Sequence, residues 1–429
     1  MNGYKSSILW QSSEKLLRIA SGLFIGIWIA RYLGTEKFGV YSYIQSFVGM
    51  FAALATLGLD GIVAREIINK GKVNDLIGTA LVLRLFGSTL LVVFVFLVAV
   101  ITNFEFQSLL VLYSFVYVLQ TFYVFDYFFQ AKVKGKVTGK IKIISLLLGI
   151  FLKVYFILSG GELSDFITVL IIEVLIISVL MFFVFTKSRK ITNLVFDFST
   201  AKELLNSSWP LIFSGFIMSI YMKVDQVMLY HMLSAEKTGI YAAAVRIADS
   251  FNFLPVIICS VLFPIVLQSK KTNAKSYHED LMSLHAIMFW LSILIAITFS
   301  LFSDFIISNT YGVEYKDAVN VLIIYTWASI PVFLSVSTTT WILSENLQKY
   351  KLLMDVSGAT LNIGLNLLMI PSFGIYGAAF ASLASYSLTL ILVSIFNKDL
   401  RLNMKLILKS IPYPFFNKQF FGFIKRRQS

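Results

Sequence analysis

The sequence LGTEKFGVY at residues 33–41 returns as LSAEKTGIY at residues 233–241, 200 residues further along the chain. Leu, Glu, Lys, Gly and Tyr are identical in the two copies, and Val40 is matched by Ile240. In each copy the stretch forms a polar break between two long apolar runs. Such a match indicates an internal repeat, provided that the surrounding apolar runs repeat as well.

The composition points to a membrane protein. Of the 429 residues, 58% are hydrophobic and 14% are charged, and 40 are Phe. Apolar runs of about 20 residues recur along the chain, which is the length that a helix needs to cross a hydrocarbon layer about 30 Å thick. The sequence therefore predicts an all-α polytopic membrane protein.

The apolar runs predict twelve transmembrane helices, six on each side of the polar stretch 187–202. The expected spans are 10–32, 39–59, 79–101, 107–130, 140–159, 163–186, 209–232, 239–268, 281–308, 316–343, 351–370 and 376–397. The expected domains are an N-terminal six-helix bundle at 1–186, a cytoplasmic linker at 187–208, a C-terminal six-helix bundle at 209–397 and a basic aromatic cytoplasmic tail at 398–429.

The distribution of Lys and Arg between the loops agrees with this count. With twelve spans, one side of the membrane carries 26 basic residues and the other carries 4, namely Arg31, Lys37, Lys237 and Lys316. The positive-inside rule therefore predicts that both termini are cytoplasmic. Six spans in each half give parallel repeats around a central cavity, an arrangement suited to a transporter in which two bundles rock.

Several other function classes are disfavoured. The formal net charge of +13 is gathered in loops on one side, so it does not indicate nucleic-acid binding. Cys259 is the only cysteine, the three histidines are scattered, and no phosphate-binding loop is present, so we expect no metal, cofactor or catalytic residue. A polysaccharide polymerase or glycosyltransferase needs a large outer loop, which the layout lacks. We therefore expect a protein that is not an enzyme.

Charged residues inside the spans are the candidate functional residues, because a charge at the bilayer centre costs about 2.5–3.5 kcal/mol on insertion scales. Near the ends of the first span lie Glu14, Lys15 and Arg18 on the inner side and Arg31 on the outer side. Deeper in the spans lie Lys153, Glu173, Lys223, Asp225, Arg246 and Asp249.

Some of these charges have a structural alternative. Arg246 and Asp249 are three residues apart, and Glu14 and Arg18 are four apart, so each pair can neutralise itself on one helix face. Lys153 and Glu173 lie at depths that long side chains can bridge. Lys223 lies near the middle of its span, and Asp225 points to a different part of the helix surface.

Taken together, this set favours a cavity with cationic faces, which suits a phosphate or diphosphate group. We predict anionic headgroup or glycan contacts at Lys223, Arg246, Lys153, Arg18 and Arg31. The carboxylates Asp225, Asp249 and Glu173 are expected to orient these cations or to carry a coupling proton or Na⁺.

Short motifs recur in both halves of the chain. The motifs in the first half are Ala30-Arg31-Tyr32-Leu33-Gly34, Phe38-Gly39-Val40-Tyr41, Leu57-Gly58-Leu59 and Arg65-Glu66. Those in the second half are Asp225-Gln226-Val227-Met228-Leu229, 239–247, Phe263-Pro264 and 371–379. In their order and spacing they resemble those of bacterial polysaccharide flippases of the O-antigen translocase type, from the multidrug, oligosaccharidyl-lipid and polysaccharide exporter superfamily. The resemblance extends from about residue 8 to residue 397.

The resemblance implies a flippase that moves an undecaprenyl-diphosphate-linked oligosaccharide, such as an O-antigen or capsule repeat unit, from the cytoplasmic to the periplasmic leaflet by alternating access. It implies a location in the bacterial cytoplasmic (inner) membrane, a role in lipopolysaccharide biosynthesis, and a polysaccharide polymerase and chain-length regulator as partners. A cation- or proton-coupled multidrug or metabolite antiporter of the same superfamily is the alternative. A lipid II flippase would be expected to carry spans beyond twelve, and the tail after Asn397 is too polar to supply them.

The tail mixes Pro412, Pro414 and five phenylalanines with basic residues. Such a composition favours binding to an anionic inner leaflet. A disordered, solubilising tail is the alternative, and the sequence does not decide between the two.

Overall fold

The computed structural model describes residues 2–189 and 191–412, and within them every regular element is helical. The chain forms two compact units, Met1–Val227 and Met228–Ser429. The helices of unit 1 are α1 (Asn2–Met50), α2 (Ala52–Thr56), α3 (Ile62–Lys70), α4 (Val73–Ile101), α5 (Gln107–Leu119), η1 (Gln120–Tyr123), α6 (Val124–Ala131), α7 (Gly135–Ser159), α8 (Leu163–Ser188), η2 (Ile191–Asn193) and most of α9 (Phe198–Met232). Those of unit 2 are α10 (Ala235–Asp249), α11 (Phe253–Thr272), α12 (Ala274–Thr310), η3 (Val313–Tyr315), α13 (Ala318–Thr326), α14 (Ser329–Ser344), α15 (Gln348–Phe396) and α16 (Lys398–Ser410).

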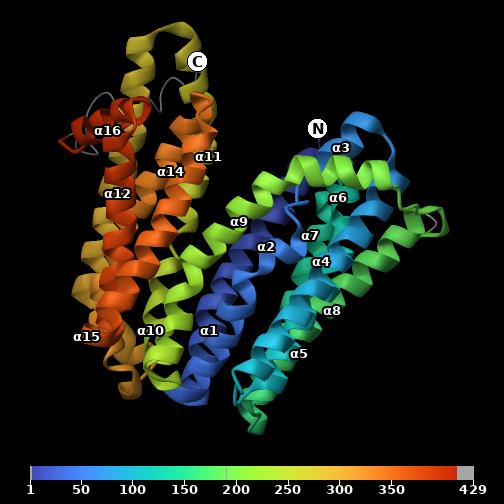
Figure 1. The fold of residues 1–429 in the computed structure, drawn as a ribbon, viewed down its shortest axis with the longest axis horizontal. Coiled ribbons are helices and arrows are strands. Elements are labelled where there is room, and N and C mark those ends of the chain that lie inside the picture. The colour runs from blue at the N-terminus through green and yellow to red at the C-terminus, as the bar shows by residue number, and fades with distance from the viewer. Residues whose placement is uncertain (1, 190, 413–429) are drawn as a thin grey trace. The chain divides into compact units, whose positions relative to one another are not determined.

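Two long helices each contain two of the predicted spans. Within the described residues, ten helical segments are long and apolar enough to cross a membrane. Gly34 in α1 (φ 74°) and Gly374 in α15 (φ 58°) interrupt the helical backbone where the polar turns are expected. Glycine tolerates such positive φ values at little cost. Counted with these two breaks, the segments correspond to the twelve predicted spans, and the predicted fold class is confirmed (Figure 1).

The internal repeat is visible in the places where helices break. The second span is interrupted at Phe51, between α1 and α2, and the eighth is interrupted at residues 250–252, between α10 and α11. The fourth span contains the 3₁₀ turn η1, and the tenth is interrupted at residues 327–328. Broken helices at corresponding positions of the two halves are typical of transporters built from structural repeats.

Two aromatic pairs repeat in the same way. Phe51 packs on Phe94 of α4 with ring centroids 4.7 Å apart and planes at 60°. Phe251, 200 residues later, packs on Phe299 of α12 at 5.0 Å and 58°. Each half therefore anchors the break in its second span against its third span.

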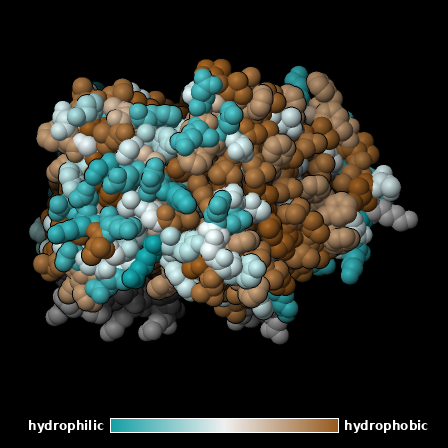
Figure 2. All heavy atoms as spheres, turned by 90° about the horizontal axis from the view of Figure 1, so that it is seen from below, coloured by the Kyte–Doolittle hydropathy of each residue, from teal (hydrophilic) through white to brown (hydrophobic). Residues whose placement is uncertain are grey.

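The surface is that of a membrane protein. Large apolar side chains are exposed along the spans, and they include Phe24, Phe86, Leu158, Leu301, Phe305 and Leu368. Figure 2 shows such brown, apolar side chains gathered over a broad part of one face. A soluble protein rarely exposes apolar area on this scale, whereas a lipid environment accommodates it.

Much of the polar linker, and the described part of the tail, is helical. α9 begins at Phe198, well before the expected span 209–232, so much of the predicted linker 187–208 is helical. In the tail, residues 398–410 form α16, which packs on α12, α14 and α15, so this part is not a disordered segment. Predictions for Lys190, Pro414, Phe415, Phe416, Phe420, Phe421, Phe423 and the basic residues after 412 lie outside the described residues.

Candidate functional site

One predicted pair of charges in unit 1 forms an ion pair between two helices. Lys153 Nζ of α7 lies 2.5 Å from Glu173 Oε1 of α8, and the two side chains are 10% and 13% exposed. Opposite charges this close and this buried attract each other more strongly than they would in water. The structure thus adopts the bridged arrangement between the fifth and sixth spans.

The sequence of α7 makes room for this pair. Ser145, Gly149 and Lys153 recur every four residues and share the buried face of the helix. A Cβ at Gly149 would overlap Glu173 Oε1, so the carboxylate crosses α7 at a position that only glycine leaves open. Ser145 Oγ donates to the Glu173 carbonyl oxygen at 2.6 Å and joins the same two helices.

A second charged group lies on α9 where it packs against α1. Asp225 is 6% exposed, and Lys223 is partly buried. Lys223 lies across Gly49 of α1, where a Cβ would be 3.0 Å from its Cε. Ser46 Oγ donates to Gln226 Oε1 at 2.8 Å in the same contact. The polar groups of this α9 segment therefore face protein rather than lipid.

In unit 2 the predicted charges lie on α10. Arg246 and Asp249 are both partly buried, and Asp249 Oδ1 accepts a hydrogen bond from Asn252 Nδ2 at 2.9 Å. Burial raises the pKa of Tyr311 to about 12, and the positive charge of Arg246 opposes this increase. Arg246 therefore interacts electrostatically with the turn between α12 and η3.

Arg18 and Arg31 lie on α1, and both are exposed. Arg18 pairs with Glu14 one turn earlier on α1, at 2.6 Å. Arg31 lies one turn before Gly34. The predicted site residues are thus divided between the units: six belong to unit 1, while Arg246 and Asp249 belong to unit 2.

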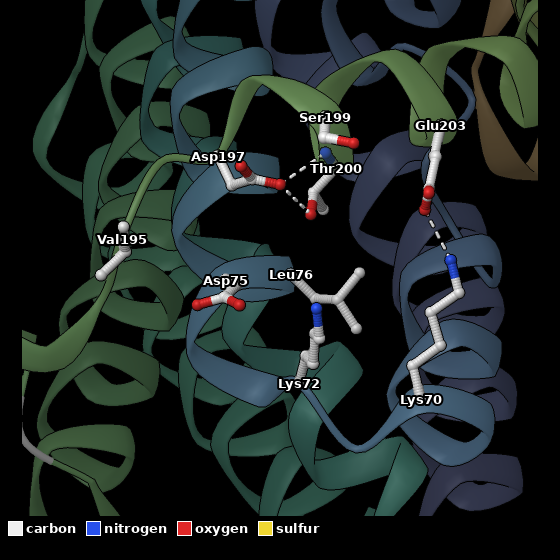
Figure 3. Close-up of a pocket in the computed structure, with 9 residues that line it drawn as sticks. All are labelled: Lys70, Lys72, Asp75, Leu76, Val195, Asp197, Ser199, Thr200 and Glu203. Atoms are coloured by element: carbon white, nitrogen blue, oxygen red, sulfur yellow. Dashed lines mark hydrogen bonds and ion pairs between the residues drawn. The ribbon is translucent and has the colours of Figure 1, made fainter.

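A pocket of about 620 Å³ lies elsewhere in unit 1, between α3, the start of α4, the linker and the first turns of α9 (Figure 3). Lys70 Nζ lies 2.5 Å from Glu203 Oε2, across a sequence separation of 133 residues. The Asp197 N–H donates to Thr79 Oγ1 at 3.0 Å. The backbone of Val195 also comes so close to Gly78 of α4 that a Cβ at this glycine would have no room. The linker is therefore packed closely against α4.

The charges of this pocket are internally matched. The hydrogen bond with Glu203 raises the pKa of Lys70, with desolvation opposing it. The Thr200 hydroxyl and N–H, 2.6 and 2.7 Å from Asp197 Oδ2, lower the pKa of Asp197. Three carboxylates, of Asp75, Asp197 and Glu203, and two ammonium groups, of Lys70 and Lys72, line the pocket. Because negative charge is in excess, the pocket does not favour a diphosphate. The basic side chains inside the membrane helices are therefore the better candidates for binding one.

Sequence reasoning missed several of these neighbours. Ser46, Gln226 and Asn252 are uncharged, and no periodic signal distinguishes a polar contact between helices from a solvated polar side chain. The cap at Asp197 did carry a signal, since Asp is one of the residues that commonly stand directly before the first turn of a helix. Among the described residues, no three His, Cys, Asp or Glu side chains gather in a way that would hold a metal ion.

The sequence was next compared with known families. Residues 7–270, more than half of the chain, match the family model described as "Polysaccharide biosynthesis protein". The chain belongs to this family. The match includes Lys153, Glu173, Lys223 and Arg246, and together with the flippase relative described next it confirms the resemblance to polysaccharide flippases.

Similar proteins agree with this assignment. The chain is 25% identical over 379 residues to the "Probable low-salt glycan biosynthesis flippase Agl15" of Haloferax volcanii, covering 86% of this chain and 78% of the relative. The fold of this chain matches that of an inward-facing multidrug resistance MATE family transporter, with a TM-score of 0.71 and 15% identity. The match covers 92% of this chain and 96% of the transporter. The fold also matches the lipid II flippase MurJ in an inward closed conformation, with a TM-score of 0.67, 17% identity and coverage of 98% and 96%. These relatives are flippases and transporters, in agreement with the prediction that the protein is not an enzyme.

Proposed function

We propose that this family member is a flippase for a polyprenyl-diphosphate-linked oligosaccharide, with an undecaprenyl carrier and an O-antigen or capsule repeat unit as its glycan. The observation that carries the proposal is the set of basic side chains held inside apolar helices, chiefly Lys153, Lys223 and Arg246. Such groups are costly in a membrane and mark substrate or ion pathways. A phosphate-bearing headgroup is the ligand that suits them best.

The proposed mechanism is alternating access between two six-helix bundles around a central cavity, from the cytoplasmic to the periplasmic leaflet of the bacterial inner membrane. Both termini are cytoplasmic in this proposal. Lys223 and Arg246 bind the diphosphate or glycan, Lys153 does so when released from Glu173, and Arg18 and Arg31 contact the substrate near the two faces of the membrane. The polyprenyl tail stays in the bilayer, and no covalent step is needed.

The carboxylates have two proposed roles. Asp225, Asp249 and Glu173 orient the basic groups, and one of them carries a proton or Na⁺ whose gradient drives transport. Glu173 suits this role, because its protonation would free Lys153 for the substrate. A polysaccharide polymerase and a chain-length regulator are the proposed partners that take over the flipped glycan.

The first test is complementation of a bacterium that lacks its own O-antigen flippase, with surface lipopolysaccharide blotted for restored glycan. We expect restoration by the parent chain and loss of it with Lys223→Ala at equal membrane abundance. Lys202→Ala is the matched control, because Lys202 is an exposed lysine on the same helix. Normal export by Lys223→Ala would remove Lys223 from the proposed site.

A binding measurement makes the test independent of the glycan. Native mass spectrometry compares undecaprenyl diphosphate with undecaprenyl monophosphate on the purified protein. We expect preferential retention of the diphosphate by the parent and by Lys202→Ala, and a loss of this preference in Lys223→Ala.

A coupled multidrug or metabolite antiporter is the second candidate, and the fold match to the MATE transporter favours it. Cells expressing the chain would then resist cationic dyes and export them. Dye resistance without diphosphate preference would replace the flippase proposal with this one.

A further inference from the structure

The short helix α16 is attached to the side of unit 2. Asn397 (φ −112°, ψ 116°) ends α15, and α16 then packs on α12 and α15 (Figure 1). Its buried face consists of Leu400, Asn403, Leu406, Ile407 and Ser410. Successive members of this set are three residues apart, except for the neighbours Leu406 and Ile407, so they occupy one side of the helix.

Three polar contacts fix α16 in this position. Asn403, 1% exposed, accepts a hydrogen bond from His285 Nε2 of α12 at 2.9 Å, and its Nδ2 donates to Thr338 Oγ1 of α14 at 3.0 Å. At the start of the helix, Asp399 Oδ2 accepts a hydrogen bond from Tyr350 OH at 2.5 Å. α16 is therefore an integral part of unit 2, with one defined face turned outward.

The outward face carries a stripe of positive charge. Lys398, Arg401, Lys405 and Lys409 are exposed and recur every three or four residues, opposite the buried face. Leu402 and Leu408, which are 44% and 59% exposed, lie on the two sides of this stripe. The only acidic residue of α16, Asp399, is already bonded to Tyr350.

We propose that the basic face of α16, made of these four residues with Leu402 and Leu408, binds the anionic phospholipid surface of the membrane. A row of ammonium and guanidinium groups complements lipid phosphates, and flanking leucines suit the boundary between headgroups and acyl chains. Because α16 is fixed to α12 and α14, lipid binding on one face is coupled directly to two spans of unit 2. This inference does not depend on the nature of the transported substrate.

The test places a bimane label at Leu402→Cys in a Cys259→Ser background, in the full-length protein. The protein is reconstituted in phosphatidylcholine vesicles containing a minority of phosphatidylglycerol, with bromine on the acyl chains of one lipid or the other. At matched bromine content, we expect stronger quenching by brominated phosphatidylglycerol, weakened by added salt. Each lysine near an anionic surface contributes about fivefold to local enrichment at low salt.

Two paired variants make the result specific. Lys405→Gln with Lys409→Gln should abolish the preference for phosphatidylglycerol while α16 stays docked, because neither exposed lysine forms a hydrogen bond or ion pair with the described residues that hold the helix. Lys271→Gln with Lys275→Gln, also exposed in unit 2, should retain the preference. Equal quenching by both lipids, no quenching by either, or a preference that survives in the first pair would overturn the proposal. A label left unquenched by both lipids would instead direct the search to an acidic protein partner.

Discussion

Lys153 Nζ lies 2.5 Å from Glu173 Oε1 and joins two neighbouring membrane helices of unit 1. Replacing Lys153 with Met leaves the carboxylate buried without its cation, which typically costs about 3–5 kcal/mol. We expect Lys153→Met to lower the thermal unfolding midpoint in detergent strongly. The double variant Lys153→Met with Glu173→Gln should recover most of this loss.

The charge-swapped pair separates a structural role from substrate binding. Lys153→Glu with Glu173→Lys keeps an ion pair across the same helices, so the unfolding midpoint should be close to that of the parent. If Lys153 also contacts the substrate headgroup, glycan export should remain low in the swapped protein. Full export by this variant would assign a purely structural role to the pair, and a stable Lys153→Met single variant would contradict the energetic argument.

Gly149 is the position at which this pair is most easily disturbed. An added Cβ would overlap Glu173 Oε1, so Gly149→Ala forces the carboxylate away from Lys153. In an open helix position the same change is favourable by about 0.5–1 kcal/mol. We expect Gly149→Ala to lower both the unfolding midpoint and export, whereas Gly22→Ala, where nothing lies within 4 Å, should not. Equal behaviour of the two variants in a thermal-shift assay would show that α7 and α8 move apart without cost.

Much of the fold could be predicted because its dominant signals are local. A span is an uninterrupted apolar run, and the repeat of residues 33–41 at 233–241 established two equivalent halves. The helix break at Phe51 could not be placed, because it lies in apolar sequence with no proline or charge beside it. The break at residues 250–252 directly follows Asp249, but it lies inside a run long enough to be counted as one continuous span. The rings that pack at the two breaks, Phe94 on Phe51 and Phe299 on Phe251, are distant in sequence.

The candidate site was predictable in its residue types and in two of its pairs, Glu14 with Arg18 and Lys153 with Glu173. The cost of burying a charge singles out Lys153 and Glu173, but their pairing depends on Gly149, whose role appears only once α7 and α8 are packed. The docking of α16 was likewise invisible, because Asn403 in a basic tail gives no sign of a buried partner such as His285.

Asp197 gives the linker a dependence on pH. Hydrogen bonds from the Thr200 side chain and backbone lower the pKa of this carboxyl, so its ionised form is favoured in the folded protein. The ionised carboxylate therefore stabilises the folded protein fully above the ordinary Asp pKa of about 3.9. This stabilisation is lost as the pH falls through the lower pKa that Asp197 has in the folded protein. Asp197→Ala should reduce the unfolding midpoint at neutral pH, and its difference from the parent should shrink in acid. Ser199→Ala, in the same helix turn, should show no such change, and a difference that is constant with pH would exclude the carboxylate as its source.

His285 links α16 to the spans of unit 2. Its ring is fully buried, with Nδ1 2.8 Å from Ser337 Oγ of α14 and Nε2 2.9 Å from Asn403 Oδ1 of α16. Truncation to Ala leaves buried polar atoms without partners, at about 1–3 kcal/mol each. Since about 1.4 kcal/mol corresponds to a factor of ten in an opening equilibrium, backbone amides of residues 398–410 should exchange hydrogen about ten times faster or more.

Hydrogen exchange followed by mass spectrometry measures this effect peptide by peptide. His278→Ala is the matched control, because His278 lies on the same helix but is only partly buried. We expect its α16 peptide to exchange as in the parent, and peptides of unit 1 to be unchanged in both variants. Unaltered protection of residues 398–410 in His285→Ala would mean that the apolar contacts of Leu400, Leu406 and Ile407 hold α16 without the histidine.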